Sequence, residues 1–212
     1  MIDEENFTIE PLMPIWDAAV AGHWDIVKEW LWRDPSLINV TGEASVADWM
    51  SEYKDLSLFH LAVAWCSDVE VLKYLVSQGA DVQKTRGSNK TSLHIAALHN
   101  SVEVLQYLIS QDADVNAVEQ HWNRSPLHYA CEKNSWDVAQ YLISQGADVH
   151  ARDCEGYTPL HIAAMENTVE VLQCLVSQGA DVHAKCAGNG TPLKHAAERN
   201  SVADDFLGGC LK

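Results

Sequence analysis

The sequence predicts an all-α fold in which antiparallel helix pairs stack in series as a solenoid, with short β-hairpin loops between the pairs. The first observation is a near-duplication: "TSLHIAALHNSVEVLQYLISQDADVNAV" at 91–118 returns as "TPLHIAAMENTVEVLQCLVSQGADVHAK" at 158–185. The second is a period, because histidines that follow a leucine or phenylalanine recur at intervals of 34, 34 and 33 residues. They are His60, His94, His128 and His161. A period of about 33 residues is typical of arrays of repeated helical units.

The first helix of each unit is predicted by the residues that start it. Ser125 and Thr158 carry hydroxyls that can cap a helix, and Pro126 and Pro159 suit the first helical position, where no N–H is needed. The run "LHIAA" then begins a short helix whose alanines let a neighbouring helix approach closely. Asparagine, which tolerates a left-handed backbone, is expected at the turn that follows. These turn residues are Asn100, Asn134, Asn167 and Asn200.

The second helix is predicted by hydrophobic periodicity. In "SVEVLQYLISQ" the apolar residues recur on one helical face. They are Val102, Leu105, Leu108 and Ile109. In the first unit Trp30 stands where later units carry a leucine, so we expect it in the core. Gly79, Gly146 and Gly179 are expected to end this helix with positive φ. Asp112 takes that place in one unit, at an expected cost of about 0.5–1 kcal/mol relative to glycine.

These residues resemble the ankyrin repeat, whose pattern is T-P-L-H-x-A-A followed by a second helix and G-A-D-V-N-A. The resemblance covers almost the whole chain in several successive copies. It implies an ankyrin-repeat solenoid whose repeated histidine is structural and bonds between adjacent loops. It also implies a protein that binds other proteins and has no enzymatic activity of its own, and we expect no cofactor.

The chain is expected to form a single ankyrin-repeat domain over residues 1–212. Within it we predict an N-terminal capping unit at 11–40, an insertion or enlarged finger at 41–54, four internal repeats at 55–185 and a C-terminal capping unit at 186–212. The insertion would either grip a partner or fold as a lid over the first units. In the last unit Asp204 and Asp205 stand where another unit has Val104 and Leu105, as a polar outer face of a terminal unit requires.

The resemblance also implies where a partner would lie, along a concave surface formed by the hairpin tips and the first helices. The residues at those places include aromatic and thioether side chains typical of binding hot spots. They are Trp65, Leu98, His99, His121, Trp122, Arg124, Glu132, Tyr157, Met165 and Glu166, with Trp49 added from the insertion. Local packing against the next hairpin is the competing role for Trp122. Its loop holds one extra residue near Glu119, and a hairpin loop accepts an insertion at little cost.

Catalytic and metal-binding motifs give no competing interpretation. The sequence contains no G-x-x-x-x-G-K-[ST], H-E-x-x-H or G-x-S-x-G. Equivalent histidines of successive units stand about 8–10 Å apart, too far to share a zinc ion. The six cysteines form no C-x-x-C pair, so we expect reduced, structural thiols. We therefore expect a non-catalytic adaptor, inhibitor or effector. The alternative is a sensor that binds a small ligand or peptide in the same groove, and an enzyme is the less favoured class.

Charge and hydropathy limit the partners further. Thirty acidic against fourteen basic residues give a formal net charge of −16, which disfavours nucleic acid and anionic membranes and favours a basic protein surface. The start "MIDEENFTIE" lacks the pattern of a secretory signal, and no apolar run is long enough to span a membrane. We expect a cytoplasmic monomer, while delivery into a host cell by another route stays open.

One candidate modification concerns Asn116. The stretch "LISQDADVN" resembles the sequence that asparaginyl hydroxylases accept in ankyrin proteins, with Leu108 eight residues and Asp114 two residues before the asparagine. Hydroxylation of Asn116 is therefore expected only in a cell that possesses such an enzyme.

Overall fold

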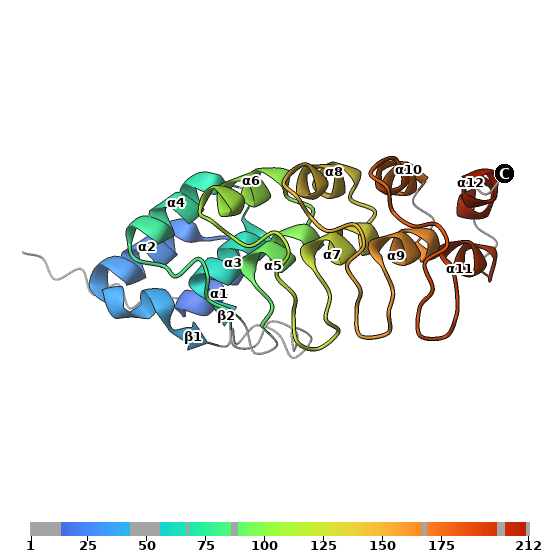
Figure 1. Ribbon diagram of the computed structural model, residues 1–212. Coiled ribbons are helices and arrows are strands. Elements are labelled where there is room, and N and C mark those ends of the chain that lie inside the picture. Colours follow the sequence, from blue (N-terminus) through green and yellow to red (C-terminus); the bar gives the residue numbers. More distant parts are fainter. Residues whose placement is uncertain are drawn as a thin grey trace, which may run out of the picture. The chain divides into compact units, whose positions relative to one another are not determined.

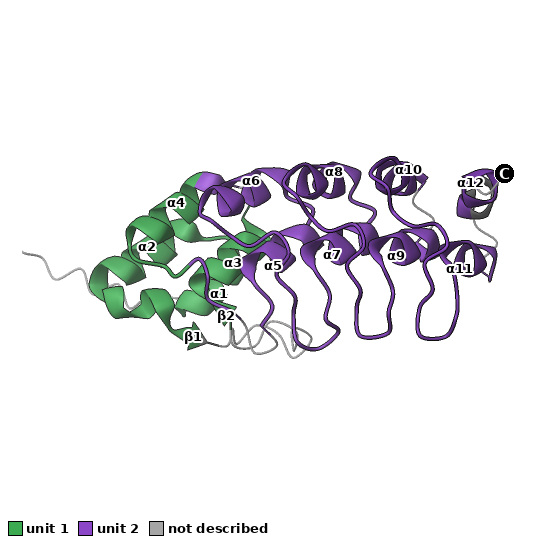
Figure 2. Ribbon diagram, viewed as in Figure 1, with its two compact units in different colours: residues 1–66, 70–81 green, residues 67–69, 82–212 purple. Residues whose placement is uncertain are grey.

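A computed structural model of the chain describes residues 14–42, 56–66, 68–85, 89–166, 169–198 and 202–210. The chain falls into two compact units, which Figure 2 distinguishes by colour. Unit 1 comprises Met1–Cys66 and Glu70–Asp81, and unit 2 comprises Ser67–Val69 and Val82–Lys212. The predicted fold class, an all-α solenoid of stacked helix pairs, is confirmed. Most of the predicted insertion, including Trp49, lies outside the described residues.

Unit 1 holds two helix pairs and a short strand pair. Its elements are α1 (Ile15–Val20), α2 (Trp24–Arg33), the 3-10 helix η1 (Pro35–Asn39), β1 (Thr41–Gly42), β2 (Leu56–Ser57), α3 (Leu58–Trp65) and α4 (Val69–Ser77), whose first residue belongs to unit 2. The two strands pair antiparallel, with Thr41 opposite Ser57 and Gly42 opposite Leu56. This strand pair joins the start of the predicted insertion, at 41–42, to residues 56–57 just after its end.

The core of unit 1 corrects one expectation. Helix α1 packs against α2 and α3, and the residues of α2 that it buries are Val27 and Leu31, which are one helical turn apart. Trp30 is only half-buried, so its predicted place in the core was wrong. The indole sits one residue away from the buried face of α2, where the apolar stripe is carried by smaller side chains.

Unit 2 repeats one arrangement: a first helix, a tight turn, an antiparallel second helix and a hairpin loop (Figure 1). The first helices are α5 (Ser92–Leu98), α7 (Pro126–Glu132), α9 (Pro159–Met165) and α11 (Pro192–Glu198). The second helices are α6 (Val102–Ser110), α8 (Trp136–Ser144), α10 (Val169–Ser177) and α12 (Val202–Cys210). Each first helix contacts the next first helix, and each second helix the next second helix, so the unit has two layers of helices with loops extending from the first layer.

Hydrophobic periodicity places the core of unit 2 between these layers. Leu105 and Leu108 are fully buried, as predicted, whereas Val102 and Ile109 are half-buried. Val104 supplies the third buried position of α6. Alanines of the first helices, such as Ala96 and Ala130, are also fully buried and let neighbouring helices approach closely. Helix α12 is as long as α10, but the side chains of Asp204 and Asp205 lie outside the described part of the chain.

The turns carry the backbone conformations that the sequence predicts. Asn100 and Asn134 adopt φ of 57° and 53° between the helices of a pair, while Asn167 and Asn200 lie outside the described residues. Gly146 adopts φ of 89° after a second helix, and Gly79 and Gly179 have similar values. Asp112 takes the same place with φ of 61°. The chain therefore holds a non-glycine residue in the left-handed region at this one of the four equivalent positions.

Three histidines join three of the four first helices of unit 2 to the hairpin loop that follows. Nδ1 accepts a hydrogen bond from the N–H of the residue that caps the helix, from Thr91 at 3.2 Å, Ser125 at 3.2 Å and Thr158 at 3.1 Å. These contacts belong to His94, His128 and His161. Nε2 bonds to a backbone carbonyl oxygen of the loop, that of Arg124 at 3.0 Å, Tyr157 at 3.2 Å and Gly190 at 3.3 Å. Because a carbonyl only accepts, the ring proton sits on Nε2. The structural role that the resemblance implies is thus confirmed.

Candidate partner-binding surface

Three hairpin loops of unit 2 are each closed by a backbone hydrogen bond between their first and last residues. The N–H of Glu119 donates to the carbonyl of Arg124 at 3.1 Å, and the N–H of Asp153 donates to the carbonyl of Tyr157 at 2.9 Å. The last loop repeats this with Cys186 and Gly190 at 3.0 Å. Neighbouring loops also bond to each other, the Cys154 N–H to the Trp122 carbonyl and the Ala187 N–H to the Glu155 carbonyl, both at 2.8 Å. The loops therefore form one hydrogen-bonded row.

A buried carboxylate organises the first two of these loops. The Asp153 carboxylate accepts from the N–H groups of Glu155 at 3.0 Å and Tyr157 at 2.9 Å. Glu119 occupies the same place in the preceding loop, is only 1% exposed, and accepts from the N–H groups of His121 and Trp122, both at 2.7 Å. That loop is one residue longer than the next, and a glutamate side chain is one methylene longer than an aspartate. The sequence indicated the extra residue but not this carboxylate, whose role shows only when the loop is folded.

Trp122 is the most prominent apolar residue of the hairpin row. Its side chain is 45% exposed, and the His121 ring packs edge-on against it with ring centroids 4.8 Å apart. The Trp122 backbone is fixed on both sides, by Glu119 and by Cys154. Asn123, with φ of 56°, anchors the tip by donating from Nδ2 to the carbonyl of Arg152 at 2.9 Å. The indole is thus exposed on a backbone that has little freedom.

Arg124 and Glu132, both predicted contact residues, bind each other. Arg124 Nη1 lies 2.7 Å from Glu132 Oε2, and Arg124 Nε lies 3.4 Å from Asp153 Oδ2. The side chains of Arg124 and Glu132 are 21% and 34% exposed, so both still reach the surface. Because the guanidinium joins one hairpin loop to the carboxylate of the next, Arg124 stabilises the row as well as lining it.

The other predicted residues divide between the ends of the first helices and the loops. Leu98 and Met165 are the last residues of α5 and α9 and are half-buried, as is His99, the C-cap of α5. Glu166, the C-cap of α9, is exposed. Burial lowers the pKa of His99, and the nearby Lys133 ammonium lowers it further. Repetition of the unit therefore brings the ends of successive first helices into one line within unit 2.

Tyr157 ends a hairpin loop of unit 2, and Trp65 lies in unit 1. The Tyr157 ring is half-buried and packs edge-on against His161 and His195, with centroids 5.7 and 5.4 Å away. Its side chain therefore contributes to packing between two units as well as to the loop surface. Trp65 ends α3 in unit 1 and is 39% exposed.

Asn116 bridges two successive units through its amide. Nδ2 donates to the carbonyl of Gly146 at 3.0 Å, and Oδ1 accepts from the N–H of Asp148 at 2.8 Å. Asn39 makes the equivalent pair of bonds in unit 1, to Gly79 at 2.7 Å and Asp81 at 2.8 Å. The side chain of Asn116 is exposed, yet both ends of its amide are engaged. The Asn116 amide therefore holds successive units together through two hydrogen bonds.

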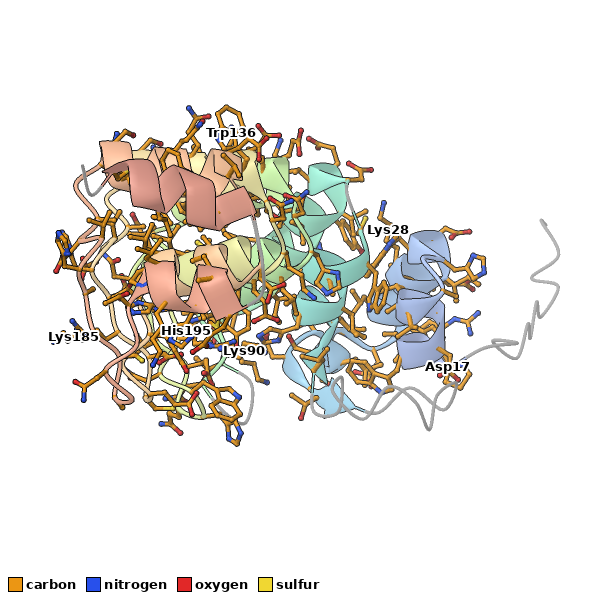
Figure 3. All side chains as sticks on the ribbon, turned by 90° about the vertical axis from the view of Figure 1, so that its right-hand side faces the viewer. Asp17, Lys28, Lys90, Trp136, Lys185 and His195 are labelled. Carbon is orange, nitrogen blue, oxygen red and sulfur yellow. The ribbon has the colours of Figure 1, made fainter. Side chains whose placement is uncertain are left out.

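The sequence did not indicate the grooves that lie between second helices. One, of about 530 Å³, runs between α6 and α8, and another, of about 490 Å³, runs between α8 and α10. Trp136 lines the second groove and is 41% exposed, on the side of unit 2 that faces away from the hairpin loops (Figure 3). Both grooves are open and lined largely by polar residues such as Gln140 and Ser144.

The part of the chain that the structure describes offers neither a candidate metal site nor a candidate membrane-spanning helix. No cluster of three histidine, cysteine or acidic side chains there has the arrangement of a metal site. None of the helices within the described ranges combines the length and apolar composition that a membrane crossing demands.

Comparison with known families agrees with the geometry. A family model of ankyrin repeats, three copies long, matches residues 15–119, 59–153 and 145–204. The chain therefore belongs to the ankyrin-repeat family, whose members are in general protein–protein interaction modules and typically non-catalytic. No curated protein matches the chain.

Proposed function

We propose that the protein is a non-catalytic interaction module, an adaptor, inhibitor or effector, which acts as a cytoplasmic monomer and binds a partner protein along its hairpin loops and first-helix ends. The observation that carries the proposal is Trp122, an indole 45% exposed on a loop whose backbone is fixed by hydrogen bonds. Exposed aromatic side chains on a rigid backbone supply contact area with little loss of conformational entropy on binding.

The neighbouring residues support the same surface. His121 packs against the indole, Arg124 and Glu132 lie beside it, and Leu98 and Met165 add apolar area at the helix ends. An apolar centre with a polar rim is the usual composition of a protein interface. Trp65 and Glu166 are proposed as further contacts, and Trp49 remains a proposal from the sequence alone.

The proposed partner presents a basic surface. The formal net charge of −16 would steer a basic protein toward this chain and speed its association, and it disfavours nucleic acid or an anionic membrane as the partner. Steering of this kind weakens as salt screens the charges. The association rate with the captured partner should therefore fall between low and physiological ionic strength, while the dissociation rate changes less.

Two tryptophans of nearly equal exposure provide the test. Trp122 is 45% exposed on a hairpin loop, and Trp136 is 41% exposed on a second helix. Partners are captured from the native cell with the wild-type chain, and their affinities for Trp122→Ala and Trp136→Ala are then measured by calorimetry. The proposal expects Trp122→Ala to weaken binding by about 2 kcal/mol or more and Trp136→Ala to leave it unchanged. An unchanged dissociation constant for Trp122→Ala would refute it.

The alternative of a small-ligand or peptide sensor makes a different prediction. The two grooves described above lie between second helices, so they give no support to a ligand site at the hairpin groove. Native mass spectrometry of freshly purified protein separates the alternatives, because a retained small mass would favour the sensor.

Hydroxylation of Asn116 also remains a proposal. The exposed amide and the preceding Leu108 and Asp114 support it. Mass spectrometry of protein from its native cell should then find one added oxygen on the peptide that contains Asn116. The unmodified mass in every preparation would exclude the modification in that cell.

A further inference from the structure

The last hairpin loop and helix α11 bring a thiol, an imidazole and a carboxylate together. Cys186 Sγ lies 3.6 Å from His195 Nε2, and His195 Nδ1 lies 3.4 Å from Glu198 Oε2. Cys186 is 7% exposed, the His195 side chain is 16% exposed and the Glu198 side chain is 56% exposed. These three side chains therefore form a line from an almost buried thiol to a carboxylate at the surface. The line passes through His195, which Figure 3 labels.

Both members of the thiol–imidazole pair are departures from the repeat. Cys186 closes its loop through the same backbone bond as Glu119 and Asp153, so it stands where the preceding loops carry a buried acid. His195 stands one residue after the repeated histidine, where the other first helices of unit 2 have Ile95, Tyr129 and Ile162. Lys194 occupies the place of the repeated histidine itself. Two substitutions that are separate in the sequence thus meet in one contact.

A third departure makes room for this contact. Gly190 occupies the place of Arg124 and Tyr157 at the end of its loop. A Cβ atom at Gly190 would collide with His195 Nε2 and would lie 3.2 Å from Cys186 Sγ. The glycine is needed here for close approach rather than for its backbone conformation, because its φ is not in the left-handed region. The imidazole can face the thiol only because this position lacks a side chain.

The Glu198 carboxylate, next to Nδ1, favours the tautomer in which Nε2 faces the sulfur as a base. An ionised carboxylate 3.4 Å from Nδ1 of His195 attracts the ring proton to that nitrogen. Nε2 then presents its lone pair to Cys186 Sγ–H, and a proton can pass from sulfur to nitrogen. The Glu198 carboxylate would stabilise the resulting imidazolium.

Other charged and titratable groups surround the pair. The Tyr157 and His161 rings have centroids 5.4 and 5.9 Å from that of His195, and Lys194 Nζ lies 4.0 Å from Glu198 Oε1. His161 Nε2 bonds to the carbonyl of Gly190 at 3.3 Å, so it donates to the backbone of the same loop. The Lys194 ammonium weakens the electrostatic attraction between Glu198 and the imidazolium. It lies near Oε1 of Glu198, whereas His195 lies near Oε2.

We propose that Cys186 is a reactive thiol, with His195 as its base, that forms a mixed disulfide with small-molecule disulfides. The Cys186 proton moves to His195 Nε2, and the thiolate attacks one sulfur of the disulfide. A new S–S bond forms as the old one breaks, and the leaving thiolate takes the proton from His195. The products are Cys186 joined to one half of the disulfide and one free small thiol, so the disulfide is the oxidant and no further reactant is needed.

The test compares cysteines within one chain. The full-length protein is incubated with glutathione disulfide at pH 6.5, acid-quenched at intervals, and each cysteine peptide is quantified by mass spectrometry. Cys154 and Cys210 are exposed, so accessibility alone predicts that they react before Cys186. The proposal expects the reverse, with Cys186 modified about tenfold faster, because the attacking species is the thiolate.

Two variants identify the cause. His195→Ile introduces the residue that α5 and α9 carry at the equivalent position, and it should remove the advantage of Cys186 while leaving the Cys154 rate unchanged. Glu198→Gln changes an exposed side chain, so it should leave the fold intact. It should slow the reaction of Cys186 by a smaller factor than His195→Ile does.

Either of two results would overturn the proposal. One is a wild-type Cys186 that reacts more slowly than Cys154 at pH 6.5. The other is a His195→Ile variant, folded by circular dichroism, in which Cys186 reacts as fast as before. Should that variant unfold, an unchanged Cys186 rate in Glu198→Gln decides against His195 as the base.

Discussion

The Glu119 carboxylate accepts the backbone N–H of Trp122 at 2.7 Å, so the most exposed indole of the hairpin row is positioned by a side chain that is itself buried. The same carboxylate also accepts the N–H of His121. A buried acid therefore links the stability of this loop to the presentation of the surface proposed for a partner.

Glu119→Ala should destabilise the protein by about 1–3 kcal/mol, because it leaves part-buried N–H groups of the loop without their acceptor. Glu103→Ala is the matched control, since Glu103 is an exposed residue of α6 and its loss should cost less than about 0.5 kcal/mol. Urea denaturation monitored by circular dichroism gives both values. Equal stability of the two variants would show that the carboxylate does not hold the loop.

Asp112→Gly should stabilise the protein by about 0.5–1 kcal/mol, because Asp112 adopts φ of 61° where the other units have glycine. Gly146→Ala tests the same position from the opposite direction. No neighbouring atom lies within 4 Å of a Cβ atom built at Gly146. The unfolding free energy that Gly146→Ala loses, about 1 kcal/mol, would therefore come from the backbone conformation alone. The two midpoints of denaturation should shift in opposite directions, and a shift in the same direction would contradict the explanation.

Local signals in the sequence were sufficient for the fold. Capping residues, the asparagine and glycine turns and the apolar residues of α6 act within one or two helical turns, so a single unit contains all the information needed to place them. Val104 rather than Val102 completes the buried stripe, because a helix buries a face that is set by its neighbours as well as by its own period. Trp30 was misplaced for the same reason.

The candidate site was less predictable. Trp122 follows from its place in the repeat, but the role of Glu119 depends on N–H groups that point inward only after the loop has folded. Arg124 and Glu132 were predicted as contacts, and their ion pair with each other could not be inferred from positions eight residues apart in a loop and a helix. Cys186 and His195 each break the repeat, which is a usable signal, yet only the structure shows that they meet.

Stability should fall as the pH falls through the range in which the repeated histidines would gain protons. Burial lowers the pKa of His94 and of His128 from 6.5 to about 4, against smaller opposing effects of their hydrogen bonds to Arg124 and Tyr157. The unfolded chain therefore binds these protons more readily than the folded chain, so their destabilising effect is small at pH 7 and grows as the pH falls through 6.5 toward 4. Each histidine should remove about 1 kcal/mol of unfolding free energy between pH 7 and 5.5.

Urea denaturation at pH 7.0, 6.0 and 5.5 measures this dependence, in a range where ordinary carboxylates stay ionised. His94→Gln lowers stability at every pH, and it should also remove one histidine's share of the slope. A slope unchanged by His94→Gln would mean that His94 does not resist protonation in the folded state.

His150→Asn should stabilise unit 2 by about 1 kcal/mol, because it would restore a bridge that the repeat has lost. The His150 N–H donates to the Asp148 carboxylate at 2.8 Å, as the Asn116 N–H donates to Asp114 at 2.9 Å, so the two turns have the same backbone. An asparagine at 150 could therefore reach the carbonyl of Gly179 and the N–H of Asp181, the equivalents of the groups that Asn116 bonds. Asn116→Ala should lose a similar amount, and His150→Ala should be nearly neutral because the imidazole is exposed. Thermal denaturation of the three variants gives the comparison, and a His150→Asn no more stable than His150→Ala would show that the amide bridge adds nothing at this joint.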